Sequence, residues 1–135
     1  ADEYIDQIAI PGLQRGVKEG LIDAVDGFCE EIAFSAQQIE RLFKIAKSLN
    51  IPVKLHAEQL SDQKGALLAA RYNGLSADHL EHLAATDVAE FASSGAVAVL
   101  LPGAFYTLRE TKLPPIQQLR KHDVDIAIAT DCNPG

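Results

Sequence analysis

Residues 51–59 have the sequence IPVKLHAEQ, which predicts a short buried strand that ends on a histidine. Val53 and Leu55 alternate with a lysine, and His56 stands where the apolar run stops. The segment that begins at Ser61 has helical spacing, so the two elements form one βα unit. Such units carry their chemistry at the carboxyl end of the strand. His56 is therefore either a metal-binding or catalytic residue or a hydrogen-bonded histidine of the core.

The same pattern recurs along the chain. Five apolar runs, at intervals of roughly 20 to 30 residues, alternate with segments of helical spacing. The runs lie at 24–30, 53–56, 75–79, 96–101 and 124–131. Several are apolar without clean alternation, which favours parallel strands covered by helices. The sequence predicts an α/β fold, a partial TIM (β/α)8 barrel with about five parallel strands, because a closed barrel needs eight strands and about 250 residues.

Local signals predict where the helices begin and end. Ser35 followed by Gln38 is a capping box, which predicts a helix that begins there. Apolar residues at helical spacing in residues 2–20 predict a helix that is broken at Pro11-Gly12. Thr86 is expected to cap a later helix. The sequence LLPGAF at 100–105 predicts the end of a strand followed by a turn.

Polar side chains stand at the ends of four of the five runs. They are Glu30, His56, His79 and Asp131. In a (β/α) barrel the carboxyl ends of the strands converge on one face, so residues far apart in sequence become neighbours. Two imidazoles and a carboxylate suit zinc or iron, with an open coordination position for water.

Composition excludes several classes of partner. The net charge is −7 and the isoelectric point is near 4.9, which argues against a nucleic acid. No apolar run is long enough to cross a bilayer, and the N-terminal ADEYIDQI is not a secretory signal, so we expect no membrane partner. Cys29 and Cys132 lack a CxxC spacing, which favours reduced thiols in a cytoplasmic protein.

Blocks of the sequence, taken together, resemble a known family. VDGFCEE, KLHAEQLSD, ALLAARYNGLSADHLEH, AVAVLLPGAFYTLRET and IAIATDCNPG are similar to consecutive blocks of the imidazolonepropionases, amidohydrolase-superfamily enzymes of histidine breakdown. The resemblance covers nearly the whole chain from about residue 20 onward. It implies that residues 1–135 are the C-terminal portion of the catalytic barrel, without the N-terminal strands and the small β domain.

The resemblance also implies a metal and a reaction. His56 and Asp131 match metal ligands at the ends of barrel strands five and eight, which would hold one zinc or iron ion per subunit. His79 matches a catalytic histidine of strand six. The implied reaction is hydrolysis of the ring amide of 4-imidazolone-5-propanoate to N-formimino-L-glutamate. Asp131 would take the proton of the attacking water and His79 would assist the oxyanion, although which of the two is the base stays open.

Three further residues match positions that contact the small-molecule substrate or product. They are Gln59, Asn133 and Gly135. The amide of Gln59 can both donate to and accept from a cyclic amide. The HxH pair of strand one and the Arg, Tyr and His that hold the substrate in relatives are absent, so the sequence contains half of a metal site.

Other polar and aromatic residues receive structural interpretations. Glu30 is interpreted as a surface or helix-capping carboxylate, and Glu58 as facing solvent or bracing its loop. Cys29 and Cys132 are interpreted as small packing residues, with tuning of the site as the alternative for Cys132 because it lies beside Asp131. Phe105 and Tyr106 are candidates for lining the mouth of the pocket.

Two other functions are open at this point. A different amidohydrolase-superfamily hydrolase or deaminase would keep His56, His79 and Asp131 without needing Gln59 or the NPG tail. A non-catalytic half-barrel that binds a partner through its exposed edges is the other. The oligomeric state is also open, with a homodimer among the possibilities.

Overall fold

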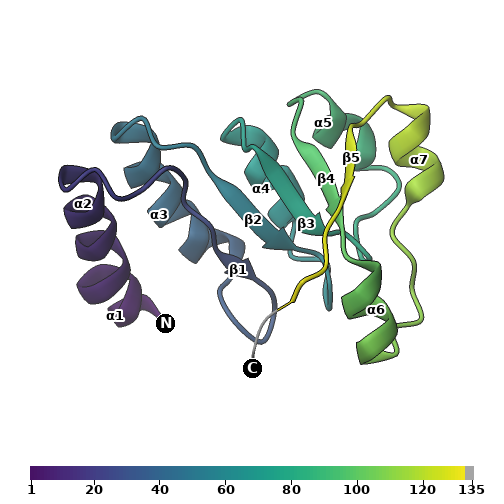
Figure 1. The fold of residues 1–135 in the computed structure, drawn as a ribbon, viewed down its shortest axis with the longest axis horizontal. Coiled ribbons are helices and arrows are strands. Elements are labelled where there is room, and N and C mark those ends of the chain that lie inside the picture. Colours follow the sequence, from purple (N-terminus) through teal and green to yellow (C-terminus); the bar gives the residue numbers. More distant parts are fainter. Residues whose placement is uncertain (133–135) are drawn as a thin grey trace.

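The computed structural model describes residues 1–132 and shows one parallel sheet with helices packed on it (Figure 1). The strands follow one another in the order β1-β2-β3-β4-β5. They are β1 (Phe28–Cys29), β2 (Lys54–Ala57), β3 (Ser76–His79), β4 (Val97–Leu100) and β5 (Ile126–Ile128). Helical segments are α1 (Asp2–Tyr4), the π-helix η1 (Ile5–Ala9), α2 (Ile10–Lys18), α3 (Ala36–Ser48), α4 (Gly65–Arg71), α5 (Val88–Ala92), α6 (Pro102–Leu108) and α7 (Ile116–Lys121). This confirms the α/β fold with five parallel strands.

The two faces of the sheet have different surroundings. In Figure 1, α3, α4 and α5 lie behind the sheet, and no helix of the described residues covers the near face of β2 and β3. Leu55 and Ala57 are fully buried, and α4 packs so closely that a Cβ on Gly65 would lie 2.9 Å from the Ala57 Cβ. Lys54 and His56 alternate with them and are half-buried on the opposite face. The alternation of β2 therefore turns His56 toward the uncovered face.

Helix α3 follows from its sequence. The Ser35 side chain accepts a hydrogen bond from the Gln38 N–H, and the Gln38 side chain accepts one from the Ser35 N–H. This reciprocal pair is the predicted capping box, which satisfies two backbone donors at the helix start. Ile39, Phe43 and Ala46 are buried at helical spacing on the side that faces the sheet.

The predicted break at Pro11-Gly12 is wrong. Helical structure continues from Asp2 to Lys18, and η1 precedes the proline. Pro11 has no N–H to donate and its ring crowds the carbonyl of the preceding turn. A π-helix has a wider turn, which here is closed by a hydrogen bond from the Ile10 N–H to the Ile5 carbonyl. This turn tolerates the missing N–H and the bulk of the Pro11 ring without ending the helix.

Two predicted helix starts are also wrong. Helix α4 begins at Gly65, because the Ser61 hydroxyl donates to the Glu30 carboxylate and does not cap a helix. Helix α5 begins after Asp87 without a side-chain cap, and the Thr86 hydroxyl donates to the Asp87 carboxylate. In both places the hydroxyl group that was expected to cap a helix donates a hydrogen bond to a carboxylate instead. That carboxylate is distant in sequence for Ser61 and adjacent for Thr86.

The LLPGAF segment forms more than the predicted turn. Pro102 is the first residue of α6, a position where its fixed φ and missing N–H are tolerated. The strand ends at Leu100, one residue before the predicted run does, and the chain continues as a helix instead of a turn.

Candidate functional site

The ends of β2, β3 and β5 bring three predicted residues together. The rings of His56 and His79 have centroids 4.4 Å apart, and His79 Nε2 lies 3.9 Å from Asp131 Oδ2. The His79 side chain is 4% exposed, whereas Asp131 is 40% exposed. A buried imidazole thus lies between a second imidazole and a carboxylate that solvent can reach. This is the convergence of strand ends that the sequence predicted.

His79 reaches this cluster through an unusual backbone. In the sheet register, His56 pairs with Asp78 and His79 pairs with Ala57, which faces the helices. Regular alternation would therefore turn His79 toward the helices. Instead His79 (φ 81°) and Leu80 (φ 71°) both have left-handed backbone conformations, which turn the His79 ring toward His56. Such conformations cost about 1–3 kcal/mol each and tend to occur at functional sites.

Burial sets the charge state of His79. Removal from water, together with the nearby His56, lowers the pKa of His79 to about 4, although Asp131 and Glu30 oppose the shift. The His79 imidazole is therefore neutral at neutral pH, with one ring nitrogen as a donor and the other as an acceptor.

Glu30 is a buried organising residue, so its interpretation as a surface or helix-capping carboxylate is wrong. It is 1% exposed and accepts hydrogen bonds from the backbone N–H groups of Gln59 (2.6 Å) and Leu60 (3.2 Å) and from the Ser61 hydroxyl (2.6 Å). Its Oε1 also lies 3.4 Å from His56 Nε2. Burial raises the pKa of Glu30, but these contacts outweigh burial and hold the pKa below its ordinary value.

Glu58 braces the other end of the same loop, so the alternative that it faces solvent is wrong. Its fully buried carboxylate accepts the backbone N–H groups of Gly65 (2.6 Å) and Ala66 (2.7 Å) at the start of α4. Burial raises the pKa of Glu58 to about 7, although the two hydrogen bonds act in the opposite direction. Gln59 follows Glu58 in the chain, donates its backbone N–H to Glu30, and is 6% exposed.

Glu81 is a site residue that the sequence reasoning missed. It is 2% exposed, and its Oε2 lies 4.0 Å from His79 Nδ1. Burial raises the pKa of Glu81 to about 7. The signal that could have identified it is the sequence HLE at 79–81, which places a carboxyl group two residues after a strand-end histidine.

The described residues do not form a metal site by themselves. Within residues 1–132, no group of three or more His, Cys, Asp and Glu side chains is arranged to hold a metal ion. Asn133 and Gly135, which were expected to contact substrate or product, lie outside the described residues.

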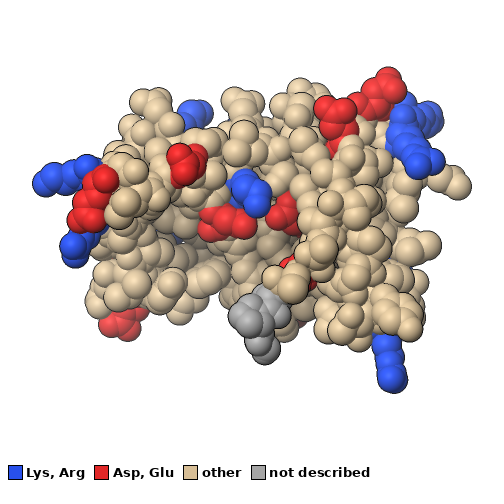
Figure 2. Space-filling model, in the orientation of Figure 1, with Lys and Arg blue, Asp and Glu red and all other residues tan. Residues whose placement is uncertain are grey.

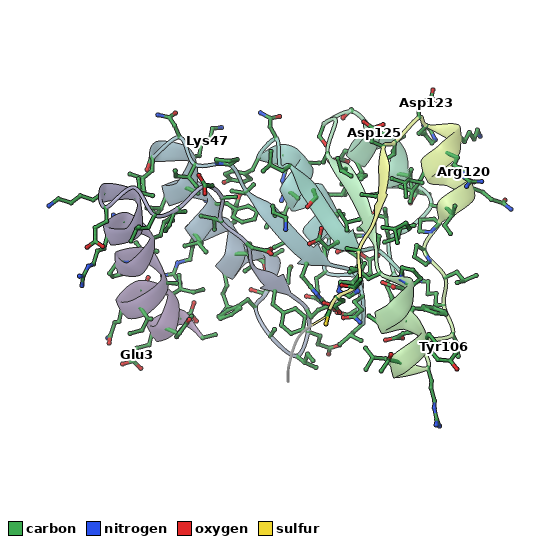
Figure 3. All side chains as sticks on the ribbon, in the orientation of Figure 1. Glu3, Lys47, Tyr106, Arg120, Asp123 and Asp125 are labelled. Carbon is green, nitrogen blue, oxygen red and sulfur yellow. The ribbon has the colours of Figure 1, made fainter. Side chains whose placement is uncertain are left out.

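Two interpretations of neighbouring residues need correction. Cys132 is exposed and is not a packing residue. Tyr106 is 85% exposed on α6, away from the ends of β2 and β3, so it does not line the pocket mouth (Figure 3). Phe105 lines an apolar pocket with Leu113 and Ile116, and Glu81 borders the same pocket.

The uncovered face of the sheet has few charged groups, and they are paired. Figure 2 shows a largely uncharged face with a small group of acidic and basic side chains near its centre. On the same side of β2 as His56, the Lys54 ammonium lies 3.7 Å from Asp78 and 3.8 Å from Asp26. No helix of the described part is long and apolar enough to cross a membrane.

Curated relatives match the chain along its whole length. It is 62% identical to the imidazolonepropionase of Psychrobacter cryohalolentis, over 99% of this chain and 31% of that protein. It is 61% identical to that of Roseobacter denitrificans (99% and 34%) and 63% identical to that of Rhizobium meliloti (98% and 32%). The chain thus spans about a third of the length of these relatives. No protein-family model matches it.

Solved structures of low sequence identity share the fold. An Arabidopsis N6-mAMP deaminase has a TM-score of 0.76 at 10% identity, covering 91% of this chain and 38% of that chain. A zinc-bound adenosine deaminase from Xanthomonas campestris has a TM-score of 0.66 at 21% identity, covering 92% and 31%. The five parallel strands are therefore part of an amidohydrolase-type (β/α) barrel. In sequence the whole chain is thus similar to about a third of an imidazolonepropionase, and its fold is shared by these deaminases.

Proposed function

We propose that the protein containing this chain hydrolyses the ring amide of 4-imidazolone-5-propanoate to give N-formimino-L-glutamate. The observation that supports this most strongly is the 62% identity to an imidazolonepropionase over 99% of the chain. Because the chain spans about a third of that relative, the rest of the active site would come from other parts of the protein. We place residues 1–135 in the C-terminal part of the barrel.

The donor groups present fit one zinc or iron ion per subunit. His56 and Asp131 supply an imidazole nitrogen and a carboxylate oxygen, which both metals accept. Buried Glu30, 3.4 Å from His56 Nε2, fits the carboxylate that commonly orients a ligating histidine. When bound, the ion would lower the pKa of a water molecule from about 15.7 to about 7.

Asp131 and His79 divide the proton chemistry in this proposal. Asp131, which solvent can reach, takes a proton from the attacking water and returns it to the departing ring nitrogen. His79 is neutral and buried, and its Nε2 lies on the Asp131 side, where a donated hydrogen bond would stabilise the oxygen of the attacked carbonyl.

Gln59 is the proposed contact to the imidazolone ring. Its backbone N–H is held by Glu30, and the next helix is held by Glu58, so the loop that carries it is fixed at both ends. A neutral amide can donate to one polar atom of a cyclic amide and accept from another. Asn133 and Gly135 are proposed to contact the ring-opened product.

The net charge and the cysteines support a proposal for the partners and the cellular location of the protein. The substrate is a small molecule, and we propose no nucleic-acid or membrane partner because the chain carries a net charge of −7. Both cysteines are free, which suits the reducing cytoplasm. A homodimer is a proposal that sedimentation of the purified protein would decide.

The experiment compares substrates and one variant in the full-length protein. We expect turnover of imidazolonepropionate to exceed that of cytosine and guanine, and Asp131→Ala to abolish it by removing a ligand and the proposed base together. Asp125→Ala is the matched control, because Asp125 is exposed and lies at the opposite end of β5 (Figure 3). Preferred deamination of cytosine or guanine would support a deaminase instead, and an unimpaired Asp131→Ala variant would remove Asp131 from the mechanism.

A further inference from the structure

Glu81 is a buried carboxyl group that the proposed reaction does not use. It lies in the loop after β3 and is 2% exposed, and its Oε2 has no hydrogen-bond partner in the described part of the chain. A carboxyl oxygen that is removed from water without a partner is unfavourable, so its position requires a physical explanation.

The nearest candidate partner is the catalytic histidine. His79 Nδ1 is also buried without a hydrogen-bond partner in the described residues, and it lies 4.0 Å from Glu81 Oε2. On the opposite side of the ring, Nε2 lies 3.9 Å from Asp131 Oδ2. The imidazole therefore lies between two carboxyl groups, one buried and one accessible.

The surroundings of Glu81 offer little else. Its carboxyl group borders an apolar pocket whose other lining side chains, from β4, α6, β5 and the segment 113–116, carry no polar groups. A hydrogen bond to His79 is the way to satisfy both buried atoms at once, and active-site hydrogen bonds that are long in the free protein commonly tighten when substrate binds.

We propose that Glu81 is a positioning residue whose carboxylic O–H donates to His79 Nδ1, so that the neutral ring carries its proton on Nε2 and holds it toward Asp131. An imidazole ring can turn about its Cβ–Cγ bond, which puts Cδ2 in the place of Nδ1 and Cε1 in the place of Nε2, and a hydrogen-bond partner at Nδ1 selects one of the two orientations. The kinetic part of this inference rests on the proposed hydrolase function, because His79 acts on the substrate there.

The test uses three variants of the full-length protein. In Glu81→Ala we expect kcat to fall about 10- to 100-fold, with KM changed less than about twofold, because the substrate contacts stay in place. In Glu81→Gln we expect most of kcat to return, since an amide can donate to or accept from Nδ1 in either tautomer. Glu90→Gln, an exposed carboxylate on α5, is the control and should behave like the unaltered protein.

A crystal structure of each variant supplies a second readout. In Glu81→Ala the His79 ring should turn or occupy two orientations, and in Glu81→Gln and Glu90→Gln it should keep the position of the unaltered protein. Should Glu81→Ala fail to fold, Glu81→Met replaces it, because methionine fills the same space without a hydrogen-bonding oxygen.

The inference is overturned if Glu81→Ala keeps its kcat, if Glu81→Gln is as impaired as Glu81→Ala, or if kcat falls while the His79 ring does not move. Failure of the proposed function is a different result. If the unaltered protein does not hydrolyse imidazolonepropionate, that function is lost, and the orientation of the His79 ring in the variants alone decides the role of Glu81.

Discussion

At the scale of single residues, buried carboxyl groups organise the candidate site. Glu30, Glu58 and Glu81 are each at most 2% exposed, and each lies next to a residue with a proposed role. Glu30 and Glu58 accept hydrogen bonds from backbone N–H groups, and these bonds offset the free-energy cost of burying the two carboxyl groups. The Oε2 of Glu81 has no hydrogen-bond partner in the described residues and lies 4.0 Å from His79 Nδ1, which is why Glu81 is the carboxyl group with an inferred positioning role.

We predict that Glu30→Ala weakens both the loop and metal retention in the full-length protein. The change leaves the Gln59 and Leu60 N–H groups and the Ser61 hydroxyl without their acceptor. Each such loss costs about 1–3 kcal/mol, and loss of a carboxylate behind a ligating histidine typically lowers metal affinity about 10- to 100-fold. Hydrogen exchange at residues 58–62 and metal content after dialysis measure the two effects.

Glu31→Ala is the control for this prediction, because Glu31 is the neighbouring carboxylate and is exposed. Hydrogen exchange and metal content in the Glu30→Ala variant that match those of Glu31→Ala would show that Glu30 does not organise the loop.

At the scale of elements, helix α3 is the segment whose local sequence and tertiary packing agree best. Its capping box comes from the positions that the sequence predicts, and its buried side chains, Ile39, Phe43 and Ala46, have helical spacing. We predict that Ser35→Ala lowers the free energy of unfolding by about 1 kcal/mol, because the side chain no longer accepts the Gln38 N–H. Urea denaturation measures this change.

Ser48→Ala, in the last turn of the same helix, is the comparison for Ser35→Ala. Ser48 is exposed and its hydroxyl donates to the Ile45 carbonyl, which already lies within the helix. Its replacement should change the free energy of unfolding by less than about 0.5 kcal/mol. Equal effects of the two substitutions would argue that the capping box contributes nothing specific.

At the scale of the whole molecule, the sheet has two edges in the described residues. β1 pairs with β2 and β5 pairs with β4; on its other side β1 has a single bridge to Phe34, and no strand of the described residues pairs with the other side of β5. Exposed sheet edges promote association with other chains. Ile128 on β5 is 68% exposed, so the edge is also apolar.

We predict that the 135-residue chain produced alone is not a stable monomer. Its edge strands and the uncovered sheet face should cause self-association at micromolar concentration, which sedimentation velocity would detect. A stable, metal-free monomer would contradict this prediction, and it would favour a binding module over part of a barrel.

The α/β fold, the order of strands and helices, and the three residues at the strand ends were predictable from the amino-acid sequence alone. These follow from local patterns, because apolar runs and their polar last residues are contiguous in the chain and parallel strands share one direction. Only the tertiary structure decided that Glu30 and Glu81 are buried and that His79 faces His56 rather than the helices. The physical reason is that burial depends on segments about 30 residues away, and the left-handed backbone at His79 and Leu80 is stable only within its packed surroundings.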